Sequence, residues 1–222
     1  MNIDYDELYC NVDDFCKGFE PWYRASLISS GTKKRNRACK MSLSEIMTIL
    51  IAYHKSGMSC FKYFYLNLLK NKEKLFSHLV HYDRFISLIK LAFPALVCFL
   101  KTLEGTVTEY MFVDATPMAV CHNLRERRHK VFKGLAKKGK TSTGWFFGFK
   151  LHFILNTFGE IVSMSVTGGN VNDRSPVMDL VKGITGKLIG DKGYISKKLS
   201  AELFEQKVTL ITKIKKNMKN IL

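Results

Sequence analysis

The chain has 222 residues, a length typical of one large or two small domains with a sizeable core. Apolar residues make up 46% and charged residues 24% of it, which excludes a chain that is disordered throughout. Lysine and arginine number 35 against 19 acidic residues, so the net charge is +16. Such an excess is typical of proteins that bind a polyanion, with nucleic acid the simplest partner and an anionic membrane the second choice.

The sequence does not favour a membrane or secreted protein. Its longest uncharged apolar run is about ten residues, Leu91 to Leu100, and Pro94 interrupts it, whereas a spanning helix needs roughly 20 residues. The acidic N-terminus does not resemble a signal peptide. Six cysteines form no C-x-x-C pair, so we expect reduced, mostly buried thiols. These features predict a cytoplasmic protein that contacts no membrane.

Residues 1–105 predict a helical region. Ser42-Leu-Ser-Glu45 has the spacing of a capping box, and apolar residues then recur at helical intervals. Further helices are expected from Cys60 to Leu69 and from Tyr82 to Phe93, with Pro94 kinking or interrupting the continuation of the latter. The first two helices are joined by a short turn that contains glycine. This arrangement fits a helix-turn-helix and a plain helical hairpin equally well, and the hairpin is the commoner case.

After Gly105 the pattern changes to short β-prone runs. The first run ends at Asp114, and Trp145–Leu155 with Ile161–Thr167 predicts a β-hairpin. The later expected elements are a helix at Ser175–Val181, a strand at Lys187–Ile189, a helix at Lys197–Gln206 and a strand at Val208–Thr212. This order predicts an α/β fold for residues 106–222, with a mixed sheet and flanking helices.

An irregular insert from Pro117 to Thr143 is the most basic part of the chain. Between His122 and Lys140 it carries eight lysines or arginines and one glutamate, and five more lysines follow between 207 and 219. We expect the insert and this tail to bind phosphates with little sequence preference. The residues expected to bind nucleic acid are Arg125, Arg127, Arg128, Lys130, Lys133, Lys137, Lys138, Lys140 and Lys192.

Two acids stand out by position, because Asp114 and Asp191 each follow a short apolar strand. If these strands are parallel neighbours, both carboxylates emerge at one edge of the sheet. Such a pair can hold Mg²⁺, which prefers oxygen ligands and keeps positions open for phosphate. Two ions shared between carboxylates stabilise the attacking and leaving oxygens of a phosphoryl displacement. An aspartate before Lys-Gly is by itself more typical of a turn, but the pair beside a basic insert predicts Mg²⁺-dependent phosphoryl transfer.

Several segments of the chain also match one known pattern. They are Phe112–Asp114, Cys121–Asn123, Arg127–Gly134, Lys140–His152, Gly169–Arg174 and Gly190–Ser196. In these segments the chain resembles the DDE transposases of bacterial insertion sequences, specifically the family numbered 982. The resemblance implies a ribonuclease-H-like catalytic domain at 106–222, behind a helical region at 1–105 that helps to bind DNA ends. Family members cut DNA at the element ends with water and join the freed ends to target DNA.

The resemblance also implies a site of three acids on two Mg²⁺ ions. Asp114 and Asp191 match the first and second acids, as catalytic residues and metal ligands. The third, a glutamate on a helix after the fifth strand, has no match, so we expect a C-terminally truncated copy. Glu202 and Glu205 lie on the preceding helix and are not expected to replace it. Asp173 can approach the metals, but capping the following helix is favoured.

The sequence therefore predicts an insertion-sequence transposase that acts on its terminal repeats and on target DNA, as a homo-oligomer assembled on DNA. The alternative is a catalytically inactive DNA-binding remnant that inhibits intact transposase through mixed multimers. An RNA-binding protein is a more distant alternative. The aromatic run that begins at Trp145 can stack on an unpaired base, although its strand periodicity favours packing in the core.

Overall fold

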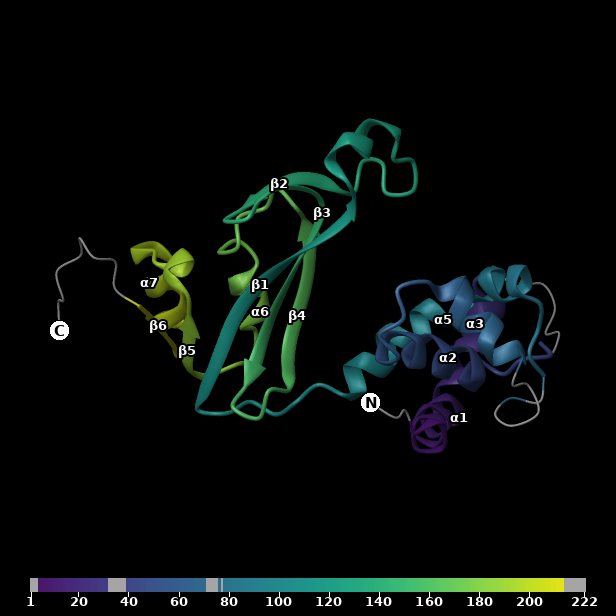
Figure 1. Cartoon of the computed structure of the whole chain (residues 1–222). Helices are drawn as coiled ribbons and strands as arrows, with labels where there is room; N and C mark the ends of the chain where they lie inside the picture. Colours follow the sequence, from purple (N-terminus) through teal and green to yellow (C-terminus); the bar gives the residue numbers. More distant parts are fainter. Residues whose placement is uncertain (1–3, 32–38, 71–75, 77, 214–222) are drawn as a thin grey trace. The chain divides into compact units, whose positions relative to one another are not determined.

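The computed structural model of the chain describes residues 4–31, 39–70, 76 and 78–213. The chain divides into two compact units, Met1–Thr102 and Leu103–Leu222, which we call the helical unit and the sheet unit (Figure 1). Each has its own cluster of buried apolar residues. The two units are therefore described separately.

The helical unit follows the helical periodicity of its sequence. Its described helices are α1 (Tyr5–Ser29), α2 (Leu43–Lys55), α3 (Phe61–Lys70) and α5 (Tyr82–Thr102). The predicted capping box is confirmed at the start of α2, where the Ser42 hydroxyl accepts the Glu45 N–H and the Glu45 carboxylate accepts the Ser42 N–H. Asp4 caps α1 by accepting the backbone N–H groups of Asp6 and Glu7.

Helix α5 runs through Pro94 to Thr102. Of the two outcomes expected at the proline, an interruption of the helix is wrong, and a kink stays a prediction. Ala92 and Ala95 on either side of the proline are fully buried, so packing in the core compensates for the lost backbone hydrogen bond. By length and composition α5 can cross a membrane, with a mean hydropathy of 1.8 in its most apolar window. This is weak support for a membrane span, because the core helix of a soluble protein passes the same test.

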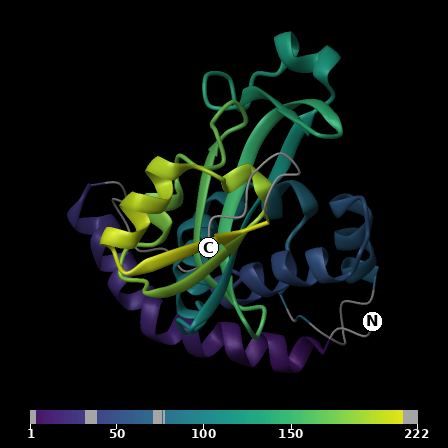
Figure 2. The ribbon, with the colours of Figure 1, turned by 90° about the vertical axis from the view of Figure 1, so that its left-hand side faces the viewer.

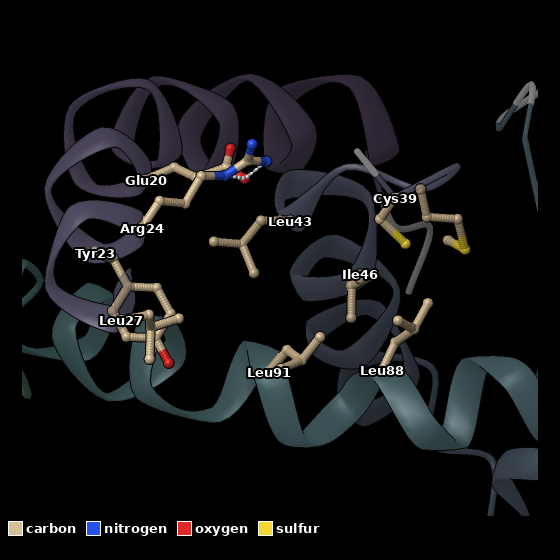
Figure 3. Close-up of a pocket in the computed structure, with 10 residues that line it drawn as sticks. Glu20, Tyr23, Arg24, Leu27, Cys39, Leu43, Ile46, Leu88 and Leu91 are labelled. Carbon is tan, nitrogen blue, oxygen red and sulfur yellow. Dashed lines mark hydrogen bonds and ion pairs between the residues drawn. The ribbon is translucent and has the colours of Figure 1, made fainter. Parts of the chain in front are cut away.

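A small apolar pocket lies among α1, α2 and α5 (Figure 3). Leu43, Leu88 and Leu91 project into it, and Glu20 forms an ion pair with Arg24 at its border. Aliphatic side chains make up most of its lining, and its acidic group is paired. The pocket therefore offers no cluster of groups for metal binding or acid–base chemistry, and we regard it as a feature of helix packing.

The cysteines are free thiols, as predicted, but the expectation that most are buried is wrong. Only Cys16 is fully buried, whereas Cys10, Cys39 and Cys60 are exposed. On α1 the buried positions are Val12 and Cys16, four residues apart, so Cys10 lies outside the buried stripe. Burial of each thiol is thus set by its position on the element and not by its apolar sequence neighbours.

The sheet unit contains one mixed six-stranded sheet, with β2-β3-β1-β5-β6 as the strand order and β4 paired to β3 (Figure 1). The strands are β1 (Tyr110–Cys121), β2 (Lys137–Thr141), β3 (Gly144–Asn156), β4 (Ile161–Gly168), β5 (Gly186–Gly190) and β6 (Val208–Thr212). The helical segments are η1 (Asn123–Arg128), α6 (Val177–Leu180), η2 (Lys192–Tyr194) and α7 (Lys197–Glu205). The predicted hairpin is β3–β4, and the predicted α/β class with flanking helices is confirmed.

Two expectations about the strands are wrong. Asp114 does not end β1, because the strand continues to Cys121 in antiparallel pairing with β3. The insert is not irregular throughout, because Lys137–Thr141 forms β2 along the first part of β3. β4 pairs only with residues from Phe149 onward. β2 therefore supplies the backbone partners for the start of β3, which would otherwise be a free edge.

The helices α6 and α7 cover one face of the sheet. Val113 and Leu188 from the strands are buried in one cluster with residues of both helices, among them Leu203. Figure 2 shows α7 running alongside β6. Side chains alternate between the faces of a strand, so Phe112 and Asp114 lie on the opposite face, where Phe112 is 43% exposed. This open face carries the candidate site.

Close packing of β1 on β3 depends on Gly148. A Cβ atom there would lie 2.0 Å from the Met118 carbonyl oxygen. We predict that Gly148→Ala lowers the free energy of unfolding by about 2 kcal/mol, measured by urea denaturation. Gly18→Ala is the control, because a Cβ at Gly18 meets no atom within 4 Å. Equal stability of Gly148→Ala and the wild type would contradict this packing.

Candidate active site and nucleic-acid interface

The two predicted acids lie at the end of the parallel pairing between β1 and β5. The last residue pair in this register is Val113 with Gly190, and Asp114 and Asp191 follow directly. Neighbouring strands are about 4.8 Å apart, which brings the two residues to one edge. Both are exposed and line one open pocket with Ile189. The predicted adjacency of the two strands is confirmed, while the roles of the carboxylates stay predictions.

Tyr194 is a buried residue on which the charges of both aspartates act. It is 3% exposed, and its hydroxyl has no hydrogen-bond partner among the described residues. Burial raises the pKa of Tyr194, and the charges of Asp173, Asp114 and Asp191 raise it further. Three carboxylates therefore act on one phenol, which stays protonated and can donate a hydrogen bond.

The two carboxylates fit the ligand preference of Mg²⁺. This ion is commonly held by one or two carboxylates, with phosphate oxygens and water at its other positions. In the part of the chain that the structure describes, no group of three or more His, Cys, Asp or Glu is placed to hold a metal. The described residues thus fit one ion completed by substrate, and they do not supply a third acid for a second ion.

The expectation for the α7 glutamates agrees with the structure. Leu199 and Leu203 turn α7 toward the buried core, on the face opposite Asp114. Glu202 instead lies near Lys198 of the same helix, at 3.7 Å. Neither Glu202 nor Glu205 lines the pocket that contains the two aspartates.

The capping role favoured for Asp173 is wrong. α6 begins at Val177, and no side chain caps its N-terminus. The Asp173 carboxylate accepts a hydrogen bond from the Lys150 ammonium at 2.8 Å, and the same ammonium donates to the Val171 carbonyl at 2.9 Å. The Lys150 side chain is only 11% exposed. This charge-assisted contact with a shielded lysine ties Asp173 to β3 and fixes the loop before α6.

Eight of the nine basic residues predicted to bind DNA line three neighbouring clefts, which we call the basic surface. The residues that line it are Arg125, Arg127, Arg128, Lys130, Lys133, Lys137, Lys138 and Lys140. The first cleft is lined by Arg125, Arg128 and Lys130, the second by Arg127, Lys130, Lys133, Lys137 and Lys138, and the third by Lys138 and Lys140. Because the first and second clefts share Lys130 and the second and third share Lys138, the surface is continuous. The third cleft reaches Gly193, two residues after Asp191. Lys192 is exposed on η2 and lines none of these clefts.

Residues 120–136 carry the first part of this surface and project beyond the end of the sheet (Figure 1). The lysine-rich tail cannot be placed in the same way, because residues 214–222 lie outside the described residues. DNA binding by the tail therefore stays a prediction.

Three polar residues of the third cleft belong to the segment Gly169–Arg174, to which the sequence assigned no binding role. Asn170, Asn172 and Arg174 line the cleft, and the Arg174 guanidinium donates to Asn172 Oδ1 and to the Ile195 carbonyl oxygen, both at 3.3 Å. Three polar side chains close together in one loop after a strand are a pattern by which a sequence can indicate a binding site. The sequence gives no local signal that this loop lies beside β2, because that contact depends on tertiary pairing.

The aromatic run on β3 divides between the core and the surface. Phe146 and Phe147 are buried, so core packing is the correct interpretation for both, but Trp145 is 57% exposed. Trp145 is the second residue of β3 and pairs there with Lys140 of β2. Core packing is therefore the wrong interpretation for the tryptophan.

His152 is a packed strand residue, as predicted, and it gives a pH test of the fold. It is fully buried, with Nε2 2.8 Å from Thr167 Oγ1. Burial lowers the pKa of His152, the positive charge of Lys150 lowers it too, and Asp173 opposes the shift. The unfolded chain therefore binds a proton at His152 more readily than the folded chain does.

We expect the free energy of unfolding to fall as the pH drops below about 6.5, the unperturbed value for histidine. His152→Gln removes this titration and should flatten the dependence between pH 7 and pH 5. Urea unfolding at both pH values measures the effect. His54→Gln, at an exposed position on α2, is the control. An undiminished pH dependence in His152→Gln would rule out this group as its source.

Comparison with solved structures agrees with this fold. The chain is similar to piggyBac transposase in a synaptic complex with hairpin DNA, at 14% identity and a TM-score of 0.50. The match covers 100% of this chain and 53% of the other, so the chain spans about half the length of that transposase. At this identity the likeness shows the fold alone, which is ribonuclease-H-like.

A second match is to the structure of a simian T-cell lymphotropic virus intasome in complex with PP2A regulatory subunit B56 gamma. It has 14% identity and a TM-score of 0.29, and covers 55% of this chain and 43% of that chain, too weak a likeness for an argument. A search of curated protein sequences found no match.

The sequence itself matches a family model described as a transposase DDE domain, over residues 104–222. This range is more than half of the chain and includes both aspartates and the basic surface. Membership of the family numbered 982, bacterial origin and truncation stay predictions. The chain belongs to the transposase DDE domain family.

Proposed function

We propose that this chain acts in DNA transposition as the transposase of an insertion sequence, with Mg²⁺ bound at Asp114 and Asp191. The observation that carries the proposal is the position of these residues, directly after the last parallel pair of β1 and β5. Two carboxylates at one sheet edge, on a chain with a continuous basic surface, suit phosphoryl transfer on DNA.

Each part of the sheet unit has a separate task in this proposal. The basic surface binds the phosphate backbone and positions the DNA without reading its sequence. Asp114 and Asp191 hold the metal, and bound Mg²⁺ stabilises the charge on the transferred phosphoryl group. Tyr194 offers a protonated hydroxyl within electrostatic range of both carboxylates. Lys150 and Asp173 fix the loop that borders the DNA-binding cleft.

The DNA partners in this proposal are the terminal repeats of the element and the target DNA. We assign binding of the element ends to residues 1–105 and catalysis to residues 106–222. Assembly of several copies on DNA brings two element ends together. These assignments rest on the resemblance to insertion-sequence transposases, and the basic surface supports the DNA-binding part.

The alternative function is DNA binding without cleavage, with inhibition of intact transposase through mixed multimers. The absence of a three-acid metal cluster among residues 4–31, 39–70, 76 and 78–213 favours it. A site of two carboxylates anchors a second ion poorly, and metal positioning supplies several kcal/mol of transition-state stabilisation, roughly. Under this alternative, the chain binds DNA with little or no end cleavage.

Metal binding tests the pair of aspartates. Asp114→Asn and Asp191→Asn should each weaken Mn²⁺ binding by roughly tenfold or more, because each removes one of two anionic ligands. The free Mn²⁺ signal in electron paramagnetic resonance measures the affinity. Asp179→Asn is the matched control, since Asp179 is an exposed acid that pairs with Lys182. Unchanged affinity in both site variants would contradict a metal site at this edge.

Cleavage separates the two functions. The substrate is a duplex with the inverted repeats that flank the gene, incubated with the chain and Mg²⁺. Cleavage that Asp114→Asn abolishes would establish a complete transposase site, and Asp173→Asn would then test whether that residue completes it. Binding without cleavage would support the alternative function. Failure to bind any DNA would contradict both.

Salt dependence tests the basic surface. Replacing Arg125, Arg127, Arg128 and Lys130 together by alanine should flatten the plot of log affinity against log salt by roughly three to four units, about one for each lost phosphate contact. Fluorescence anisotropy with a random-sequence duplex measures the slope. The control replaces Lys182, Lys197 and Lys198, which line none of the three clefts of the basic surface. An unchanged slope in the first variant would show that phosphates bind elsewhere.

A further inference from the structure

The third cleft of the basic surface contains an exposed tryptophan flanked by lysines. The Nζ atoms of Lys138 and Lys140 lie 5.4 Å and 5.6 Å from the centroid of the Trp145 ring. Lys140 is the direct cross-strand partner of Trp145, and Lys138 lies one pleat further along the same face of β2. In the described part of the chain neither ammonium forms an ion pair with a carboxylate. Both charges are thus available to a ligand that covers the ring.

The floor of this cleft is held in place by close backbone contacts. The Asn123 side-chain amide donates to the Trp145 carbonyl oxygen at 2.7 Å. Gly139 lies between the two lysines, and a Cβ there would lie 2.1 Å from the Gly169 carbonyl oxygen. The Gly169 N–H donates to the Gly148 carbonyl oxygen at 3.0 Å. The loop after β4 therefore packs directly on β2 and β3.

The remaining lining residues suit a nucleotide. Arg174 adds a positive charge, and Asn170 and Asn172 add amides that can donate and accept hydrogen bonds. The cleft has one acid, Asp173, which is already paired with Lys150. A planar apolar surface, uncompensated cations and amides are the groups that bind a base and its phosphates.

We propose that this cleft binds an unpaired nucleotide of the DNA substrate, with its base stacked on Trp145 and its phosphates beside Lys138 and Lys140. The proposal rests on the proposed function and extends it, since basic residues alone bind duplex and single strands alike. A base inside a duplex has both faces covered by its neighbours, so only an unstacked base can lie on the indole. The lysines neutralise the phosphates and hold the ring between them.

The third cleft borders the segment that carries Asp191, which relates the bound nucleotide to the proposed catalytic site. Gly193 lines the cleft and is two residues from Asp191, so the DNA-binding surface leads to the segment that carries the second aspartate. A nucleotide held open there would lie on the path between the basic surface and the carboxylate pair. We infer that Trp145 is a positioning residue that favours DNA with an unpaired end over an intact duplex.

Fluorescence of Trp145 tests the contact directly. The chain has two tryptophans, so Trp22→Phe leaves Trp145 as the sole emitter. The probes are two DNAs of the same sequence, one a blunt duplex and one a duplex with a single-stranded tail. Stacking should quench Trp145 emission with the tailed DNA and leave it nearly unchanged with the blunt duplex. Equal quenching by both, or quenching by neither while DNA still binds, would overturn the proposal.

Affinity provides the second test. Trp145→Ala should weaken binding of the tailed DNA by about tenfold, as expected for loss of one base–aromatic stack, and binding of the blunt duplex by less than about twofold. Trp145→Phe keeps an aromatic face and should recover part of the loss. Phe158→Ala, at a 77% exposed aromatic in the β3–β4 turn, is the matched control and should bind both DNAs normally.

The outcomes separate this inference from the proposed function. Equal losses for both DNAs in Trp145→Ala, or no loss for either, would overturn the nucleotide site while duplex binding by the wild type leaves the proposed function in place. A wild-type chain that binds neither DNA would contradict the proposed function itself. Lys138→Ala with Lys140→Ala should weaken both DNAs and reduce the salt dependence, which distinguishes phosphate contacts from stacking.

Discussion

The parallel pairing of β1 with β5 is the interaction on which the rest of the sheet unit depends. Four residue pairs join two segments that are distant in sequence, and the register ends at Val113 and Gly190. Parallel strands cannot be joined by a tight turn, so the chain must complete the β3–β4 hairpin and α6 before β5 can pair. This pairing sets which residues meet at the sheet edge and which face the helices cover.

The charge distribution follows from the same arrangement. Two carboxylates at one edge repel the DNA backbone, and they are compatible with DNA only if cations balance them. Residues 111–222 carry 20 basic and 8 acidic side chains, and the basic surface extends from η1 to the loop after β5. This excess of positive charge attracts phosphate and opposes the local repulsion at the acids. In the proposed function, a divalent ion at Asp114 and Asp191 would reduce that repulsion.

Local sequence signals were sufficient for most elements of the fold. The capping box at Ser42, the hairpin and the strand before Asp191 all have short-range patterns, and the order of strands and helices predicted that β1 and β5 are neighbours. Whether Pro94 interrupts α5 had no such signal, because packing around the proline decides it. The same is true of β2, which forms because the start of β3 needs a partner.

The candidate site was predictable in part for the same reason. The two aspartates follow apolar strands, which is a local pattern. The ion pair of Asp173 with Lys150 and the exposure of Trp145 are set by pairing between distant segments, and the composition around each residue pointed to a different environment. Sequence periodicity describes the faces of a strand, but it does not show where a strand lacks a covering layer.

The close contact between Gly139 and Gly169 has a thermodynamic consequence for any ligand of the third cleft. Loops commonly lose conformational entropy when they bind, and this loss subtracts from affinity. Here the loop after β4 is already fixed against β2 in the folded sheet unit. Its conformational entropy is therefore lost on folding and not on binding. Most of the contact energy is then retained as affinity, and association needs no slow rearrangement of the loop. The two glycines, which themselves line this cleft, thereby lower the entropic cost of binding any ligand in it.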